Sequence, residues 1–451
     1  MNSEIKTHKK HAKIFSFYYF IEGYSQGIPM LVFPPYLADV LGGSFDLALW
    51  TLVAFIGSLP WAIKAIVGPL SDKWGSKKLG YRFPWIFGFG SVGGFFWLMM
   101  AIYLPIDETI YLFFAIYYFA TQVGTAFSDT ALDSLILDVT PKKRLGKIQG
   151  DTWTCMILGQ GAGGMLLGLI FLALDIIPWL FVLTSFLMIL ASFLPYLIHE
   201  EPFTKIATKD MLLDIKSVFS KKRNYTVFSY TFTGGIVANV LSQFFNYVIL
   251  IAMGIIDVSQ TILSITSGNP VELLGWSSVF LFCYGLGIVI GSIISGRFLD
   301  RNRKMTVIKT YLLYIPVTLV SVIPFVLFNG MFLIALLFGI VLQIIIGALQ
   351  GALTVSNQTI RGDLTKKYYP KLKSTYFALL VALNNFGQSF GVYLGFLIFD
   401  TFAGIVMNFY LIYFILMCAC SASLSLSMLL FRTIDPKDYE LILTEGGEKD
   451  I

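Results

Sequence analysis

Four ionisable residues lie inside otherwise apolar segments of the chain: Glu22, Lys64, Asp129 and Asp133. A charge inside a bilayer is costly, so such residues are functional candidates by default. Asp129 and Asp133 are four residues apart, which places them on one face of a helix. A carboxyl group that is neutral when buried and charged in water can carry a proton. We interpret the four as proton-coupling or substrate-coupling residues. Sodium coupling and purely structural roles are the alternatives.

Lys64 is expected to need a carboxylate partner, because an unpaired buried ammonium is unfavourable. It precedes Gly68 by about one helical turn, at a depth close to that of Asp133 or Asp138. The functional hypothesis is a Lys64–Asp133 pair that protonation or substrate binding breaks. The alternatives are a structural pair with Asp138, or a side chain that reaches the inner membrane surface.

Polar side chains also follow the faces of four apolar segments. They share amide groups that lipid cannot satisfy, so they should face water, substrate or one another. Two lie in the first half of the chain, Gln26 and Gln122. Those of the second half are Asn239, Gln243, Asn246, Gln343, Gln350 and Asn357. We predict a cavity that is acidic on one side and amide-rich and neutral on the other. Helix association through these amides is the alternative.

The elements that position these residues are long apolar helices. Hydrophobic residues make up 56% of the chain and charged residues 13%, which excludes an ordinary soluble protein. A bilayer core requires about 20 apolar residues per helix. Twelve runs meet this length, at 14–40, 46–68, 84–104, 109–138, 149–173, 177–198, 226–256, 272–298, 306–328, 331–358, 374–399 and 403–431. We predict an all-α integral membrane protein with 12 transmembrane helices.

The twelve runs divide into two six-helix bundles. The predicted parts are a tail (1–13), an N-terminal bundle (14–198), a linker (199–225), a C-terminal bundle (226–431) and a second tail (432–451). The connection from Asp257 to Pro270 is the longest on the outer side and is expected to form a short helix or cap.

Charge predicts the orientation of the helices. Of the 32 Lys and Arg residues, all but Lys64 are expected at the ends or in the loops of one side. Lys and Arg are retained on the cytoplasmic side, so both termini should be cytoplasmic in a multi-pass protein of the cell membrane. The net charge of +5 therefore reflects topology, and nucleic acid is not an expected partner.

Cofactor chemistry is not expected. The three histidines lie in the N-terminal tail and an inner loop, so no intramembrane cluster could bind a metal or serve an enzyme. The four cysteines lie in apolar segments, and no P-loop string is present. We predict no cofactor, no metal and no enzymatic activity.

A short loop motif occurs once in each half. GPLSDKWGSKK begins at Gly68 and GRFLDRNRKM at Gly296, and both place Asp and then a basic residue after Gly and three further residues. The corresponding pairs are Asp72 with Lys73 and Asp300 with Arg301. A carboxylate near a helix end or basic side chains can latch two helices. We assign these six residues, with Arg82 and Asp138, to a cytoplasmic gate.

The repeated motif resembles the signature of the major facilitator superfamily, whose two halves are parallel repeats. The string LPWAIKAIVGPLSDKWGSKKLGYRFPW, from Leu59 to Trp85, resembles the folate–biopterin transporter family, although Phe83 replaces a second Arg. SDTALDSLILDVTPKKRLGKIQG, from Ser128 to Gly150, resembles that family and the muropeptide-permease and acetyl-CoA-transporter branch. The resemblance implies a central cavity lined by spans one, four, seven and ten, and a monomer.

The sequence therefore predicts secondary active transport of a small organic solute by alternating access, coupled to protons. The resemblance implies organic anions such as folates, muropeptides or coenzyme esters, whereas an acidic cavity could attract a cation or zwitterion. A drug or metabolite exporter of the same fold is the alternative. A membrane sensor without transport is a further class, which little in the sequence supports.

Overall fold

The computed structural model divides into two compact units. Unit 1 comprises Met1–Thr208 and Ile256–Ser278, and unit 2 comprises Lys209–Ile255 and Val279–Ile451. The structure describes residues 2–41, 45–76, 78–139, 148, 151–152, 155–198, 216–258, 265–266, 270–299, 302–369, 373–403, 405 and 408–440. Most of the predicted linker, residues 199–215, lies outside the described residues.

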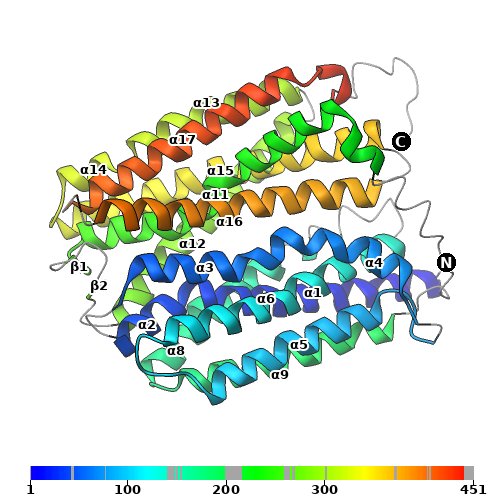
Figure 1. Cartoon of the computed structure of the whole chain (residues 1–451), viewed down its shortest axis with the longest axis horizontal. Helices are drawn as coiled ribbons and strands as arrows, with labels where there is room; N and C mark the ends of the chain where they lie inside the picture. The colour runs from blue at the N-terminus through cyan, green and yellow to red at the C-terminus, as the bar shows by residue number, and fades with distance from the viewer. Residues whose placement is uncertain are drawn as a thin grey trace. The chain divides into compact units, whose positions relative to one another are not determined.

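Unit 1 is built from helices. Its α-helices are α1 (Asn2–Leu31), α2 (Phe33–Leu41), α3 (Leu47–Ile63), α4 (Val67–Lys73), α5 (Phe83–Ile102), α6 (Ile110–Val139), α8 (Gly168–Ala173) and α9 (Ile177–Phe193). Unit 1 also contains two 3₁₀ turns, η2 (Lys64–Ile66) and η4 (Leu194–Leu197), and a π-helix, η3 (Gly161–Leu167). α5 packs against α6 and α9, and α3 packs against α6 (Figure 1).

Glycines bring α1 against the fifth predicted span. A Cβ added at Gly23 would lie 1.9 Å from the carbonyl oxygen of Met156, and one at Gly163 would lie 2.2 Å from that of Tyr24. Small residues allow such close backbone approach between membrane helices. This contact fixes the position of α1, which carries Glu22 and Gln26, within unit 1.

Unit 2 is also helical. Its elements are α11 (Lys222–Ala252), most of α12 (Pro270–Leu299), α13 (Arg303–Val320), α14 (Ile323–Leu327), α15 (Phe332–Tyr368), α16 (Lys373–Ala403), α17 (Phe409–Thr433) and the 3₁₀ turn η5 (Pro436–Asp438). α11 packs against α16 and α17, and α13 packs against α15 and α17. The most apolar window of α11 is 94% buried, so this helix forms the core of the unit.

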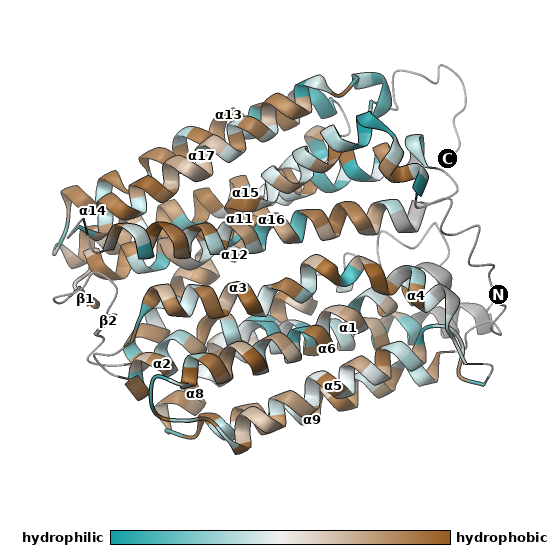
Figure 2. Cartoon of the chain, viewed as in Figure 1, coloured by the Kyte–Doolittle hydropathy of each residue, from teal (hydrophilic) through white to brown (hydrophobic). Residues whose placement is uncertain are grey.

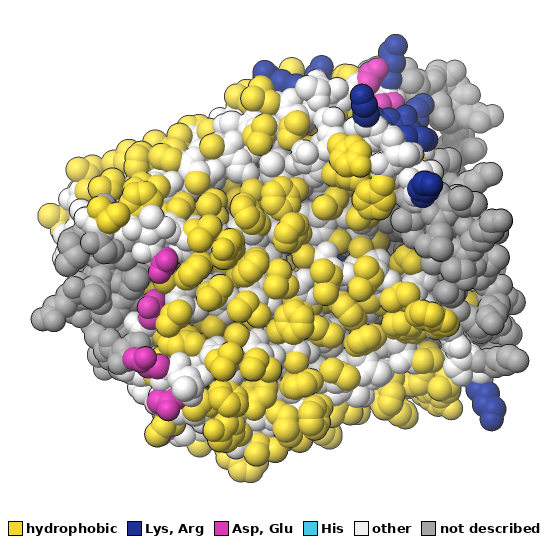
Figure 3. All heavy atoms as spheres, in the orientation of Figure 1, with side chains coloured by type: hydrophobic (Ala, Val, Ile, Leu, Met, Phe, Trp, Pro, Cys, Tyr) yellow, Lys and Arg dark blue, Asp and Glu magenta, His cyan; other side chains and the backbone are white. Residues whose placement is uncertain are grey.

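Eleven helices of the described chain are long and apolar enough to cross a membrane. Figure 2 shows their predominantly apolar composition, and Figure 3 shows hydrophobic side chains over α3, α5 and α6. α1, which carries most of the first predicted span, is not among the eleven, because residues such as Glu22 and Gln26 lower its hydropathy. Twelve crossings therefore remain a prediction.

Two local predictions were wrong. The connection after α11 contains a short antiparallel pair, β1 (Asp257–Val258) with β2 (Ile265–Thr266), in place of the expected short helix, and the alternative of a cap stays a prediction. The second concerns α15, which continues to Tyr368, ten residues beyond the predicted end of its span. Its C-cap residue, Tyr369, precedes Pro370, and helical backbone is disfavoured for a residue before a proline.

Candidate functional site

Lys64 and Asp129 form an ion pair inside unit 1. The Lys64 Nζ lies 2.7 Å from Asp129 Oδ2, and the two side chains are 11% and 5% exposed. The sequence predicts Asp133 or Asp138 as the partner of Lys64. The functional hypothesis of a Lys64–Asp133 pair is therefore wrong, because the partner is Asp129. Lys64 opens the 3₁₀ turn η2 between α3 and α4. A 3₁₀ turn rotates its residues differently from an α-helix, which changes the direction of this side chain.

Trp61 supports this ion pair from the same helix face. The Lys64 Nζ lies 4.6 Å from the centre of the Trp61 ring, a cation–π distance. The Trp61 indole Nε1 donates to Gln122 Oε1 at 2.7 Å. Gln122 precedes Asp129 by seven residues, so both lie on the same face of α6. The Trp61–Gln122 hydrogen bond and the Lys64–Asp129 ion pair therefore join that face to the C-terminal end of α3. The ammonium is thereby held by a carboxylate and an aromatic face.

Asp133 contacts α1 through a different partner. It accepts a hydrogen bond from the hydroxyl group of Tyr19, which is buried. The Asp133 residue is exposed, whereas Asp129, one helical turn away, is 4% exposed. The two carboxylates of the predicted stripe therefore differ in exposure as well as in partner.

Glu22 is the most deeply buried of the three carboxylates Glu22, Asp129 and Asp133. Its exposed fraction is 2%. Its Oε1 accepts from Gln26 Nε2 at 3.1 Å, and Gln26 Oε1 accepts from Gln160 Nε2 at 3.4 Å. Glu22 Oε2 has no hydrogen-bond partner among the described residues. A polar chain thus runs from Glu22 to the residue that precedes the π-helix η3.

The charges of this cluster do not balance. Glu22, Asp129 and Asp133 all lie within electrostatic reach of Lys64, so three carboxylates share one ammonium. Tyr18 and Tyr19, both buried, lie within electrostatic reach of these carboxylates. Excess buried negative charge is unfavourable unless a proton or another cation neutralises it. Chemically, the cluster can exchange protons or bind a cation.

The predicted amide stripes of unit 2 have partners within the unit. Gln343 Nε2 donates to Asn246 Oδ1 at 2.5 Å and joins α15 to α11. Gln350 Oε1 accepts from Tyr314 at 3.0 Å, and Asn357 accepts from Tyr230. Asn239 is half-buried, and the side chain of Gln243 lies outside the described residues. These contacts hold helices together, and a cavity-lining role stays a prediction.

A sequence comparison decides the family. The profile of the Major Facilitator Superfamily matches residues 15–342. The chain belongs to the Major Facilitator Superfamily. It is a multi-pass integral membrane protein of a family of transporters rather than enzymes. No curated protein sequence matches the chain.

Solved structures of major facilitator transporters share this fold. A bacterial homolog of the human lysosomal transporter Spinster, inward-facing and unoccupied, has a TM-score of 0.63 at 14% identity, covering 97% of this chain and 98% of its own. The nucleoside transporter NupG has a TM-score of 0.61 at 15% identity, covering 94% and 100%. The D-xylose-proton symporter has a TM-score of 0.64 at 13% identity, covering 92% and 96%.

The gate motif of this major facilitator protein is only partly described. Arg82, at the start of α5, is buried and donates from Nη1 to Ser71 Oγ of α4 at 2.6 Å. Gly296 lies in α12 with open space around its Cα. The described residues exclude Asp300 and Arg301 entirely. They also exclude the side chains of Asp72, Lys73 and Asp138 and the surroundings of Gly68.

Arg361 is a buried cation that the sequence analysis missed. It is 2% exposed within α15, so the prediction that every cation except Lys64 lies in loops or at the ends was wrong. The prediction of a neutral second half was wrong for the same reason. Nearby, Arg303 Nε lies 2.8 Å from Asp363 Oδ2. Arg361 follows Asn357 by four residues, so continuing the amide stripe by one turn would have found it.

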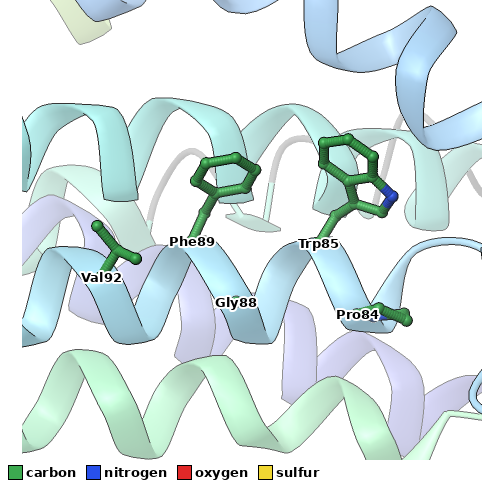
Figure 4. Close-up of a pocket in the computed structure, with 5 residues that line it drawn as sticks. All are labelled: Pro84, Trp85, Gly88, Phe89 and Val92. Atoms are coloured by element: carbon green, nitrogen blue, oxygen red, sulfur yellow. The ribbon is translucent and has the colours of Figure 1, made fainter. Parts of the chain in front are cut away.

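A pocket of about 320 Å³ lies on α5, away from these polar groups. Figure 4 shows Trp85, Phe89 and Val92 projecting from this helix beside Gly88 and Pro84. The Trp85 indole is engaged, because it donates to the carbonyl oxygen of Trp74 at 2.6 Å. The pocket contains none of the predicted site residues, and its apolar lining suits hydrocarbon rather than a polar solute.

Proposed function

We propose that this major facilitator protein is a secondary active transporter that moves a small organic solute by alternating access, coupled to protons. The observation that carries the proposal is the 2.7 Å Lys64–Asp129 pair, with Glu22 and Asp133 as additional carboxylates around one ammonium. A static structural pair would need one carboxylate. Two more acids in the same bundle provide sites that bind and release protons.

The proposed cycle uses the different access of the two α6 carboxylates. Asp133 is exposed and receives a proton first, which weakens its interaction with Tyr19. Protonation of Asp129 then removes the partner of Lys64. Glu22, buried and linked to Gln26, then remains the one charged carboxylate and balances the ammonium of Lys64. Neutralising the cluster lowers the cost of enclosing it, which permits the two bundles to reorient around the site.

The remaining parts of the proposal concern topology and the surroundings of the site. Twelve crossings with both termini in the cytoplasm follow from the sorting of Lys and Arg. We propose that the protein acts as a monomer in the cell membrane, with the lipid bilayer as its surroundings. The amides of α11 and α15 line the solute path, and the two Gly-x-x-x-Asp loops form the cytoplasmic gate.

The first test is thermal unfolding of the purified full-length protein at pH 5.5 and 7.5. The probes are pterins, folates, muropeptides, nucleotides and coenzyme A esters, each with wild type and Asp129→Asn. We expect a stabilising probe whose pH dependence is lost in the variant. Asp107→Asn is the matched control, because Asp107 lies in the exposed loop before α6. If none of these probes stabilises the protein, the organic-anion substrates are excluded and a drug exporter becomes the leading function.

The second test measures transport of the stabilising probe into proteoliposomes under an imposed pH gradient. Proton coupling predicts uptake that follows the gradient and collapses with a protonophore, in sodium and in choline buffers alike. Uptake that requires sodium would show that sodium, and not the proton, is the coupling ion. Transport that ignores the gradient, with full activity in Asp129→Asn, would overturn proton coupling through α6.

A further inference from the structure

We propose that Arg361 is the centre of an anion-binding subsite in unit 2, which takes a carboxylate or phosphate group of the transported solute. The proposal rests on the transport function above and adds the chemical class of the ligand. It depends on three features of α15 and its neighbours: a guanidinium with unmet N–H groups, a neighbouring carboxylate that is already engaged, and a cluster of polar groups around Gly234.

The guanidinium of Arg361 has few protein acceptors. Its Nη2 donates to Asn384 Oδ1 of α16 at 2.9 Å. Its Nε and Nη1 are buried and have no hydrogen-bond partner among the described residues. An arginine removed from water with unmet N–H groups is strongly unfavourable, and carboxylate and phosphate are the groups that a guanidinium binds best. The side chain is therefore prepared for an anion.

The neighbouring carboxylate of α15 does not supply this anion. Asp363 lies two residues after Arg361, and its Oδ2 is 2.8 Å from Arg303 Nε of α13. Side chains two residues apart on a helix point in different directions. Asp363 and Arg303 thus form a separate ion pair, and the positive charge of Arg361 is not cancelled by it.

Polar groups from three helices converge on Gly234 of α11, and one of them is a neighbour of Arg361. A Cβ added at Gly234 of α11 would lie 3.0 Å from Ser427 Oγ, 3.2 Å from the Tyr311 hydroxyl and 3.3 Å from Asn357 Nδ2. Tyr311 is also an electrostatic neighbour of Arg361. Hydroxyl and amide N–H groups can donate to an oxyanion. An added methyl group would crowd these polar groups, which glycine leaves undisturbed.

The position of Arg361 also corresponds to that of the acidic cluster. Arg361 precedes the last residue of α15 by seven positions, and Asp133 precedes the last residue of α6 by six. α6 and α15 carry the fourth and tenth predicted spans, which are equivalent in the predicted repeat. Equivalent helices thus carry charges of opposite sign at a similar number of residues from their own C-terminal ends, which suits a solute with an anionic group and a coupling proton at separate places.

The experiment uses full-length protein in phosphatidylcholine nanodiscs at constant ionic strength. The probes are sodium phosphate, folate and coenzyme A, with adenosine as the neutral probe, and thermal unfolding is the readout. We expect at least one anionic probe to stabilise wild type, Arg361→Gln to abolish the shift, and Arg361→Lys to retain part of it. Equal shifts in wild type and Arg361→Gln, or no shift with any anion, would overturn the proposal.

A matched pair of glycine variants tests the site without changing its charge. Gly234→Ala places a methyl group 3.0–3.3 Å from three of these polar groups and should weaken the response at least tenfold in probe concentration. Gly362→Ala lies beside Arg361 on α15 with nothing within 4 Å of its added Cβ, and should respond like wild type. This pair also decides the question if Arg361→Gln does not fold. An unchanged response in Gly234→Ala would contradict the site.

Two further measurements separate the possible sources of the anion and the two proposals. If phosphatidylglycerol in the nanodisc stabilises wild type over Arg361→Gln and no soluble anion does, the ligand is a lipid headgroup and the assignment to the solute is overturned. Asp129→Asn should keep the anion response while proton-driven uptake is lost. An anion response without proton-coupled transport would overturn the proposed function and retain the Arg361 subsite as a binding site.

Discussion

Tyr19 of α1 donates a hydrogen bond to Asp133 of α6, which joins two residues 114 positions apart in the chain. The contact gives the exposed carboxylate of α6 a partner on the helix that carries Glu22. It therefore connects the two acidic segments of unit 1.

Replacing Tyr19 by Phe should destabilise unit 1 modestly. The variant removes one interhelical hydrogen bond in a membrane setting, worth about 0.6 kcal/mol on average and at most about 2 kcal/mol. Thermal unfolding in detergent measures the change. Tyr103→Phe is the control, because Tyr103 is 55% exposed at the end of α5. Equal melting temperatures for wild type and Tyr19→Phe would contradict a stabilising Tyr19–Asp133 contact.

The Lys64–Asp129 pair should behave as a coupled unit. Lys64→Met leaves a buried carboxylate without its cation, which costs about 3–5 kcal/mol when a buried pair is broken. Combining Lys64→Met with Asp129→Asn removes both charges, so the double variant should be more stable than Lys64→Met alone. A double-mutant cycle by chemical or thermal unfolding measures the coupling. Additive single effects would show that the two groups do not interact.

The start of α6 should show a pH dependence of its own. Hydrogen bonds from the Thr109 hydroxyl and backbone amide lower the pKa of Asp107, an exposed carboxylate in the loop after α5. A lowered pKa in the folded state means that the contribution is present at neutral pH and is lost as the pH falls through that pKa, below the usual value of about 4.

Thr109→Ala tests this dependence because it removes the hydroxyl donor. Its unfolding temperature should lie below that of wild type at pH 6, and the difference should shrink as the pH is lowered to about 3, below the usual Asp value. Glu108→Gln, in the same loop, controls for general charge effects. A difference that stays constant over this range would refute the role of the Asp107 carboxylate.

Gly23 should not tolerate a side chain. A Cβ at this position would lie 1.9 Å from the Met156 carbonyl oxygen, so Gly23→Ala must separate α1 from the fifth predicted span. Overpacking of this kind costs about 1–3 kcal/mol or more. Gly88→Ala is the matched control on α5, where nothing lies within 4 Å of an added Cβ. Equal folded yields and melting temperatures for both variants would contradict the close contact.

Much of the fold follows from local properties of the chain. Long apolar runs identify the membrane helices because lipid leaves each backbone polar group to be satisfied within its own helix. The repeated Gly-x-x-x-Asp motif at Gly68 and Gly296 indicated the superfamily. The C-terminal end of α15 is harder to predict from hydropathy, because a hydropathy window stops at polar residues even when the helix continues. Arg361 was assigned to a loop for that reason.

Composition and residue spacing identify which segments are apolar, which ionisable residues fall within them, and that Asp129 and Asp133 share a helix face. The pairing of Lys64 with Asp129, and of Asp133 with Tyr19, depends instead on how the helices pack. The choice between carboxylates one turn apart depends on an axial offset of about 6 Å between two helices. That offset is set by the packing of the two helices and by the 3₁₀ turn at Lys64. The residue spacing within either segment does not determine it.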